Sequence, residues 1–243
     1  MINMHLTGKV IAIIGGATGI GKATAELCAQ RGASVVIADI EEAQGLQTAG
    51  ALNVPFFKLD VTNEADVKRV FAAIGDKYGR LDVLIPTAGV LLGPFVEIED
   101  FAAEMFRRVY DINVVGSFLC AKYAVPLMKK SGGGVIVFVS SGAATGVSSS
   151  YAYGSSKGGV LSLSGTSAGK LAKYNIRVNT LLPGNIATNM KLSVIEQEAR
   201  DHGITLQERL KEYTLGEPAG MAKVLAWLAS DDADYVRGSI VTR

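Results

Sequence analysis

The sequence predicts an α/β fold built on a doubly wound parallel sheet of about seven strands with helices on both faces. Short β-branched apolar runs alternate with longer segments of helical periodicity, which is the pattern of a sheet assembled from strand–helix units with right-handed crossovers. The runs are apolar throughout rather than at every second position, as in strands covered on both faces. With 243 residues, 49% of them hydrophobic, the chain can form one domain over residues 1–243.

The individual elements follow from the same patterns along the chain. We expect strands at Val10–Ile14, Val35–Ala38, Phe56–Leu59, Val83–Ile85, Val135–Val139 and Val178–Leu182. We expect helices at about 20–30, 64–77, 101–130, 151–173 and 218–230. The segment 189–217 is richer in charge, and we interpret it as a helical flap over the substrate, inserted before the last helix. Ligands of such sheets bind outside the carboxyl ends of the strands, so the loops that follow the strands are the candidate site.

Composition and charge exclude several classes of partner. Lys and Arg total 24 and Asp and Glu total 23, a net charge of +1, so no strong field attracts nucleic acid or an anionic membrane. The N-terminal residues lack the pattern of a secretory signal, and we expect a cytoplasmic location. Cys28 and Cys120 lie in apolar settings and read as buried free thiols. His5 and His202 stand alone, and we expect no metal site.

Glycines follow the first predicted strand. Residues 15–21 read GGATGIG, and a helical pattern begins at Lys22. Glycines at such a turn let the backbone bend sharply and approach a pyrophosphate at a helix N-terminus. A tight turn without a ligand has the same composition, and the spacing of Gly15, Gly19 and Gly21 differs from G-x-G-x-x-G. The strand–turn–helix context nevertheless favours a dinucleotide.

Asp39 closes the second predicted strand. A carboxylate at this point can accept hydrogen bonds from an adenosine ribose and would repel a 2′-phosphate. No Lys or Arg occurs among residues 15–21 or directly after Asp39, where Ile40 and Glu41 follow. The alternative is an ordinary loop aspartate. The sequence predicts NAD rather than NADP.

Two tyrosines precede one lysine in the stretch YAYGSSKGG, residues 151–159. Residues four apart share one face of a helix, so Tyr153 and Lys157 would stand together while Tyr151 points elsewhere. A free tyrosine has a pKa of about 10, too high for an efficient base at neutral pH, and a nearby cation favours the phenolate. A tyrosine and a lysine at this spacing also occur by chance, so the rest of the sequence must show whether this pair is catalytic.

Taken in order, these elements resemble the short-chain dehydrogenase/reductase family in its single-domain, NAD(P)-dependent, Rossmann-fold form. The resemblance covers nearly the whole chain. Its other motifs are LDVT at 59–62, AG at 88–89, Asn113, the serines ending the fifth strand, and PGNIAT at 183–188. It implies an oxidoreductase that transfers a hydride between NAD(H) and a secondary alcohol or ketone.

The resemblance also implies a role for each site residue. Tyr153 would be the general acid in reduction and, as phenolate, the base in oxidation. Lys157 and the positive nicotinamide would lower the pKa of Tyr153, and Lys157 would hold the nicotinamide ribose. Asn113 would connect the site to solvent through a water. The implied cofactor-binding residues, with Asp60 at the adenine and Thr188 at the carboxamide, are Gly15, Thr18, Gly19, Ile20, Gly21, Asp39, Ile40, Asp60, Val61, Ala88, Gly89, Tyr153, Lys157, Pro183, Gly184, Ile186 and Thr188.

The catalytic serine has two candidates. Counting back from Tyr153 at the family's usual spacing gives Ser140, whereas alignment of the strand GVIVFVSS gives Ser141 with one residue deleted from the following loop. Side chains alternate along a strand, so the two cannot face a ligand in the same way. We favour Ser141, because loops absorb deletions better than buried strands do.

The sequence departs from the family at three places. Ile14 stands where the family usually has Thr, and NNAG is replaced by PTAG, with Pro86 and Thr87. Pro86 has no amide donor. These changes bear on the local strand geometry and on the affinity for the adenosine half of the cofactor. The sequence ends at SIVTR, where relatives usually continue through a VDGG-like tail, which leaves the assembly open. These departures motivate one alternative, a catalytically silent NAD-binding regulatory protein of the same fold.

The residues expected to face the substrate are mostly apolar. They include no arginine clamp for a carboxylate or phosphate, so we expect a small neutral or apolar alcohol or ketone. The apolar faces of the helix that contains residues 113–130, together with the resemblance, predict a homo-oligomer, either a dimer or a tetramer. The expected substrate-facing residues are Leu91, Leu92, Phe95, Ala143, Val147 and Met190.

Overall fold

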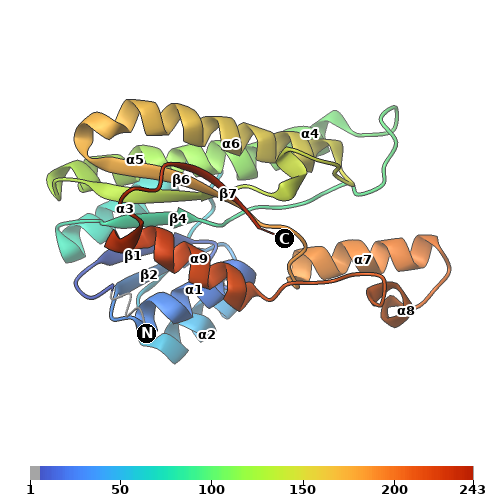
Figure 1. The fold of residues 1–243 in the computed structure, drawn as a ribbon, viewed down its shortest axis with the longest axis horizontal. Helices are drawn as coiled ribbons and strands as arrows, with labels where there is room; N and C mark the ends of the chain where they lie inside the picture. The colour runs from blue at the N-terminus through green and yellow to red at the C-terminus, as the bar shows by residue number, and fades with distance from the viewer. Residues whose placement is uncertain (1–5, 243) are drawn as a thin grey trace.

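The computed structural model, which describes residues 6–242, has a central sheet between two layers of helices (Figure 1). Within these residues the sheet has seven strands in the order β3-β2-β1-β4-β5-β6-β7, and every pair is parallel. The order reverses direction between β1 and β4, which makes the sheet doubly wound. The predicted fold class is therefore confirmed. The strands are β1 (Val10–Ile14), β2 (Ser34–Asp39), β3 (Phe56–Lys58), β4 (Val83–Pro86), β5 (Gly134–Val139), β6 (Ile176–Leu182) and β7 (Gly238–Val241).

Helices cover both faces of this sheet. On one face lie α1 (Gly19–Gln30), α2 (Glu42–Leu52) and α9 (Pro218–Ala229). On the other face lie α3 (Glu64–Tyr78), α5 (Gly116–Lys130) and α6 (Tyr151–Leu171). The helix α4 (Ala103–Tyr110) runs beside α6, while α7 (Asn189–Asp201) and α8 (Leu206–Leu210) project from one end of the sheet (Figure 1).

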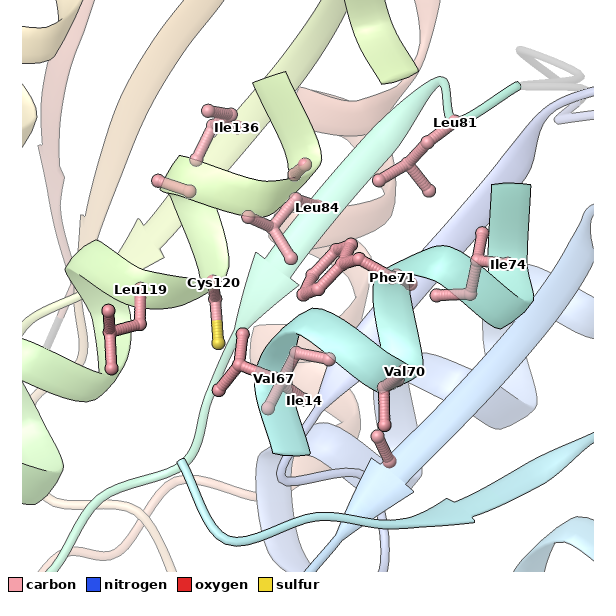
Figure 2. Packing of buried hydrophobic residues seen from close by; sticks show 14 of the residues in the cluster. Ile14, Val67, Val70, Phe71, Ile74, Leu81, Leu84, Leu119, Cys120 and Ile136 are labelled. Atoms are coloured by element: carbon pink, nitrogen blue, oxygen red, sulfur yellow. The ribbon is translucent and has the colours of Figure 1, made fainter. Parts of the chain in front are cut away.

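Each face of the sheet has its own apolar core. Figure 2 shows one of them, in which Phe71 of α3 and Cys120 of α5 pack over Leu84 of β4. Alternate residues of one strand enter different cores: Ile14 belongs to this cluster and Ile13 to the opposite one. Burial on both faces explains why the strands read as continuous apolar runs.

All six strands expected from the sequence are present, but two elements, α2 and β7, were not predicted from it. The helix α2 contains Gly45, whose hypothetical Cβ would lie 2.0 Å from the Phe56 ring. Close packing at a glycine replaces the apolar stripe that marks most helices. The strand β7 lies at the edge of the sheet, and three of its four residues are exposed, so it lacks the continuous apolarity of the inner strands.

The helix expected over 101–130 is interrupted. Between α4 and α5 the chain forms one π-helical turn, Asp111–Val115, with Asn113 buried at its centre. Such turns widen a helix and often occur at functional sites. The segment 189–217 contains the helices α7 and α8. Thr188 caps α7, and Thr205 caps α8 in a reciprocal capping box with Glu208. The role of this segment as a flap over the substrate stays a prediction.

Candidate functional site

A cavity of about 780 Å³ opens at the carboxyl ends of the strands. Its wall is formed by the loops after β1, β2, β3, β4, β5 and β6, together with residues of α6 and α7. Every predicted site residue except Asn113 lines it. Of the residues expected to face a substrate, Leu91, Ala143, Val147 and Met190 line the cavity, whereas Leu92 and Phe95 do not. The topology thus brings together residues that are far apart in the sequence.

The glycine loop after β1 packs without space for side chains. Gly15 has a φ of +87°, and a Cβ there would lie 2.5 Å from the amide nitrogen of Ala88. A Cβ on Gly21 would lie 2.1 Å from the carbonyl oxygen of Gly15. Asp39 closes the loop from β2, since one of its carboxylate oxygens accepts from the amide of Ala17 at 2.9 Å. The loop is a narrow backbone cradle with the carboxylate of Asp39 at its edge.

The two departures beside this loop preserve its geometry. Pro86 pairs with Ile14 in the register of β4 and β1, and the amides of Thr87 and Ala88 both donate to the carbonyl of Ile14, at 2.7 and 2.9 Å. The hydroxyl of Thr87 donates to the carbonyls of Ile14 and Gly15, at 2.8 and 3.0 Å. Thr87 therefore ties β4 to the glycine loop directly.

Tyr153 and Lys157 lie together at the start of α6. The helix is capped by Ser150, whose hydroxyl accepts from the amide of Tyr153 at 3.3 Å and donates to the carbonyl of Leu92 at 2.6 Å. The Lys157 ammonium lies 5.7 Å from the centroid of the Tyr153 ring. Tyr151 does not line this cavity, and its ring packs edge-on against Phe101. The geometry favours Tyr153 over Tyr151 as the reactive tyrosine.

Burial shifts the pKa values of both Tyr153 and Lys157. It lowers the pKa of Lys157 to about 8. Burial also raises the pKa of Tyr153, while a hydrogen bond with Ser141 acts in the opposite direction. The Lys157 ammonium donates to the carbonyl of Val139, at 3.0 Å. Its expected effect on the pKa of Tyr153 stays a prediction.

The two candidate serines have different surroundings. The hydroxyl of Ser140 is buried and donates to the backbone carbonyl of Lys157 at 2.7 Å, which fixes α6 against the end of β5. The hydroxyl of Ser141 accepts from the amide of Ala143 at 3.2 Å and is the one that interacts with Tyr153. Both residues line the cavity, and the hydroxyl of Ser141 is the better placed to meet a substrate.

Asn113 is fully buried and lies behind the cavity wall. Its amide oxygen accepts from the backbone nitrogen of Val90 at 2.8 Å, and its amide nitrogen donates to the carbonyl of Val90 at 3.0 Å and to the hydroxyl of Ser156 at 2.9 Å. These contacts hold the loop after β4 in place. The connection to solvent that the resemblance implies stays a prediction.

The loop after β6 lies next to the glycine loop at the cavity wall. The carbonyl of Pro183 accepts from the amide of Gly142 at 2.9 Å, which joins this loop to the serine loop. A Cβ on Gly19 would lie 3.4 Å from the methyl group of Thr188. On the other side, the carboxylate of Asp60 accepts from the amide and hydroxyl of Thr62, at 2.9 and 2.7 Å.

Two cationic side chains in the cavity wall were not predicted from the sequence. Arg108 comes from α4 and Lys191 from α7. Lys191 lies three residues after the predicted site residue Thr188, and that proximity is the signal that could have found it. Arg108 lies five residues before Asn113, and no local signal points to it. Over residues 6–242, no helix has the length and apolarity needed to cross a membrane. His5 lies outside the described residues.

Comparisons with known proteins show which family the chain belongs to. A family model described as enoyl-(acyl carrier protein) reductase matches residues 15–242. The chain is 36% identical to (+)-borneol dehydrogenase 2 of Salvia officinalis, over 97% of this chain and 87% of that protein. It is 37% identical to secoisolariciresinol dehydrogenase of Forsythia intermedia, over 98% of this chain and 88% of that protein. The crystal structure of levodione reductase superposes with a TM-score of 0.88 at 31% identity, covering 97% of this chain and 96% of that one. The chain belongs to the short-chain dehydrogenase/reductase family of oxidoreductases.

Proposed function

We propose that this protein transfers a hydride between NAD(H) and a secondary alcohol or ketone. The observation that carries the proposal is the meeting of Tyr153, Lys157 and Ser141 in the cavity that also contains the glycine loop. Related proteins named as borneol and secoisolariciresinol dehydrogenases support an alcohol as the substrate class.

The residues present fit a dinucleotide. The glycine loop is a cradle that any Cβ at Gly15 or Gly21 would fill, and it leads into the N-terminus of α1, which favours a pyrophosphate. The nicotinamide cofactor would supply or accept the hydride. In our proposal Tyr153 gives a proton to the substrate oxygen or takes one from it, and Ser141 donates a hydrogen bond to the same oxygen.

Lys157 has two tasks in this proposal. Its ammonium would hold the nicotinamide ribose, and together with the charge of an oxidised nicotinamide it would lower the pKa of Tyr153 from the value raised by burial. Asn113 does not line the cavity, and in this proposal it positions the loop after β4 through its hydrogen bonds with the backbone of Val90. The remaining predicted cofactor contacts line the cavity in positions that suit an extended dinucleotide.

We propose NAD rather than NADP as the cofactor. Asp39 lies at the cavity wall with its carboxylate bonded to the amides of Ala17 and Glu41, so the negative charge is fixed there. A 2′-phosphate beside it would face like charge, and such a juxtaposition costs several kcal/mol.

Titration of the wild type with NADH and with NADPH tests this choice, followed through energy transfer from Trp227 to the bound nicotinamide. NADH should bind about 100-fold more tightly. Asp39→Asn should strengthen NADPH binding and so reduce the ratio of the affinity for NADH to that for NADPH. Asp66→Asn on α3, outside the cavity wall, should leave this ratio unchanged. Equal affinity of the wild type for the two cofactors would contradict the assignment to NAD.

A panel of secondary alcohols with NAD tests the enzymatic proposal. NADH should appear with at least one alcohol class. NAD binding without any NADH formation would instead favour the silent regulatory protein.

We also propose that the protein is a homo-oligomer. Val115, at the end of the π-helical turn, and Phe118 of α5 are 42% and 47% exposed, and Phe106 of α4 is 37% exposed. Exposed apolar side chains of this kind suit contact with a second copy.

A further inference from the structure

Lys191 places a positive charge in the cavity wall without a matching negative charge. It is the third residue of α7, it is partly buried, and Met190 and Val194 of the same helix line the cavity beside it. Its ammonium lies 4.5 Å from the centroid of the Tyr213 ring. Throughout residues 6–242, no carboxylate comes within ion-pair distance of this ammonium.

The acid that acts on the charge of Lys191 is already engaged. Glu198, two turns further along α7, accepts from Arg209 at 3.2 Å and from the hydroxyl of Tyr213. The side chains of Glu198 and Arg209 are only 14% and 19% exposed, so this pair is a partly buried unit. It fixes the ring of Tyr213, and the ammonium of Lys191 lies against that ring. The network therefore positions Lys191. Besides the effect of burial, Glu198 raises the pKa of Lys191 and Arg209 lowers it, so the pair offsets the charge of Lys191 only in part.

Burial without a counter-ion is unfavourable for an ammonium group. Burial is also the largest influence on the pKa of Lys191, which it lowers. An anion entering the cavity would give this ammonium a partner and recover part of the cost of desolvation. Arg108, the other missed cation, is exposed, so water already stabilises its charge and an anion would gain less there.

The position of Lys191 points to the substrate rather than to the cofactor. The contact of this chain segment with the glycine loop is made by Thr188, next to Gly19. The Lys191 side chain instead lies against Tyr213, on the side of the segment 189–217 that carries α8, which projects away from the sheet in Figure 1.

We propose that Lys191 is a specificity-determining residue that binds a carboxylate on the substrate. This inference rests on the proposed function and narrows its substrate class. The substrate then has an apolar skeleton, which contacts Leu91, Met190 and Val194, and an anionic group remote from the reacting carbonyl. In this proposal the substrate is an oxo acid or a hydroxy acid, where the sequence predicts a neutral or apolar alcohol or ketone.

The test uses binding of ketones to the complex of the enzyme with NAD, which has no hydride to donate, so it does not depend on turnover. The ligands are oxo acids of increasing chain length, beginning with 4-oxopentanoate, each beside its methyl ester. Lys191→Met keeps the length of the side chain and removes the charge. It should weaken binding of the best acid about tenfold, while leaving its ester and NADH unaffected. Lys211→Met removes the same charge from an exposed position at the end of α8 outside the cavity wall, and it should change none of the three affinities.

Three results would overturn the inference. Lys191→Met could weaken the acid and the ester equally, it could change neither, or it could weaken NADH alone, which would assign the ammonium to the cofactor. Turnover then separates this inference from the proposed function. Tight acid binding that depends on Lys191, with no ketone reduced, would refute the proposed function and leave the anion site standing.

Discussion

Tyr153→Phe should abolish turnover while leaving NADH binding largely intact. The substitution keeps the ring, which packs at the start of α6, and deletes only the oxygen that carries the proton. General acid–base catalysis contributes about 10²- to 10⁴-fold to rate, so kcat should fall by that amount. Steady-state consumption of NADH measures the loss, and the titration with NADH shows whether the cofactor still binds.

The chain offers a matched control for this substitution. Tyr151→Phe removes the same oxygen from a residue that is 48% exposed and outside the cavity wall, so its activity should equal that of the wild type. A fully active Tyr153→Phe variant would refute the catalytic assignment. Loss of activity in Tyr151→Phe with retention in Tyr153→Phe would assign the chemistry to the other tyrosine.

Gly21→Ala should abolish NADH binding and destabilise the protein. The added methyl group would lie 2.1 Å from the carbonyl oxygen of Gly15 and 2.6 Å from the hydroxyl oxygen of Thr87, so the glycine loop has to move. Overpacking of this kind costs about 1–3 kcal/mol, which for a domain of this size lowers the Tm by roughly 2 to 12 °C. Thermal unfolding measures the second effect and the NADH titration the first.

Gly50→Ala in α2 provides the comparison for Gly21→Ala. The same methyl group there meets no atom within 4 Å, and alanine is favoured over glycine in a helix by up to about 1 kcal/mol. Its Tm should therefore stay the same or rise, with NADH binding unchanged. A Gly21→Ala variant that binds NADH as well as the wild type does would show that this loop is not the cofactor cradle.

The elements predicted well from the sequence are those fixed by burial on two sides. The inner strands β1 and β5 carry no polar side chain, because they are covered on both faces, and that requirement is visible in a single sequence. The edge strand β7 has no such requirement. The helix α2 relies on the contact between Gly45 and Phe56, which joins residues from two different elements and has no local signature.

The same distinction holds for the candidate site. Glycines and the spacing of Tyr153 and Lys157 are local, so they could be recognised before the fold was known. The position of Lys191 depends on Tyr213, and Tyr213 depends on Glu198. The effect of burial on the pKa of Tyr153 likewise depends on surroundings that come from several elements. Neither could be predicted from residue spacing.

Transfer of a labelled hydride tests the central claim most directly. The wild type would be incubated with NADH that carries deuterium at nicotinamide C4, on one face or the other, and with a panel of ketones that includes the oxo acids. We predict that one labelled form of NADH yields a secondary alcohol with a single deuterium on the carbinol carbon, as seen by mass spectrometry. Tight NADH binding with every ketone recovered unchanged, from both labelled forms, would contradict the account and favour a regulatory protein.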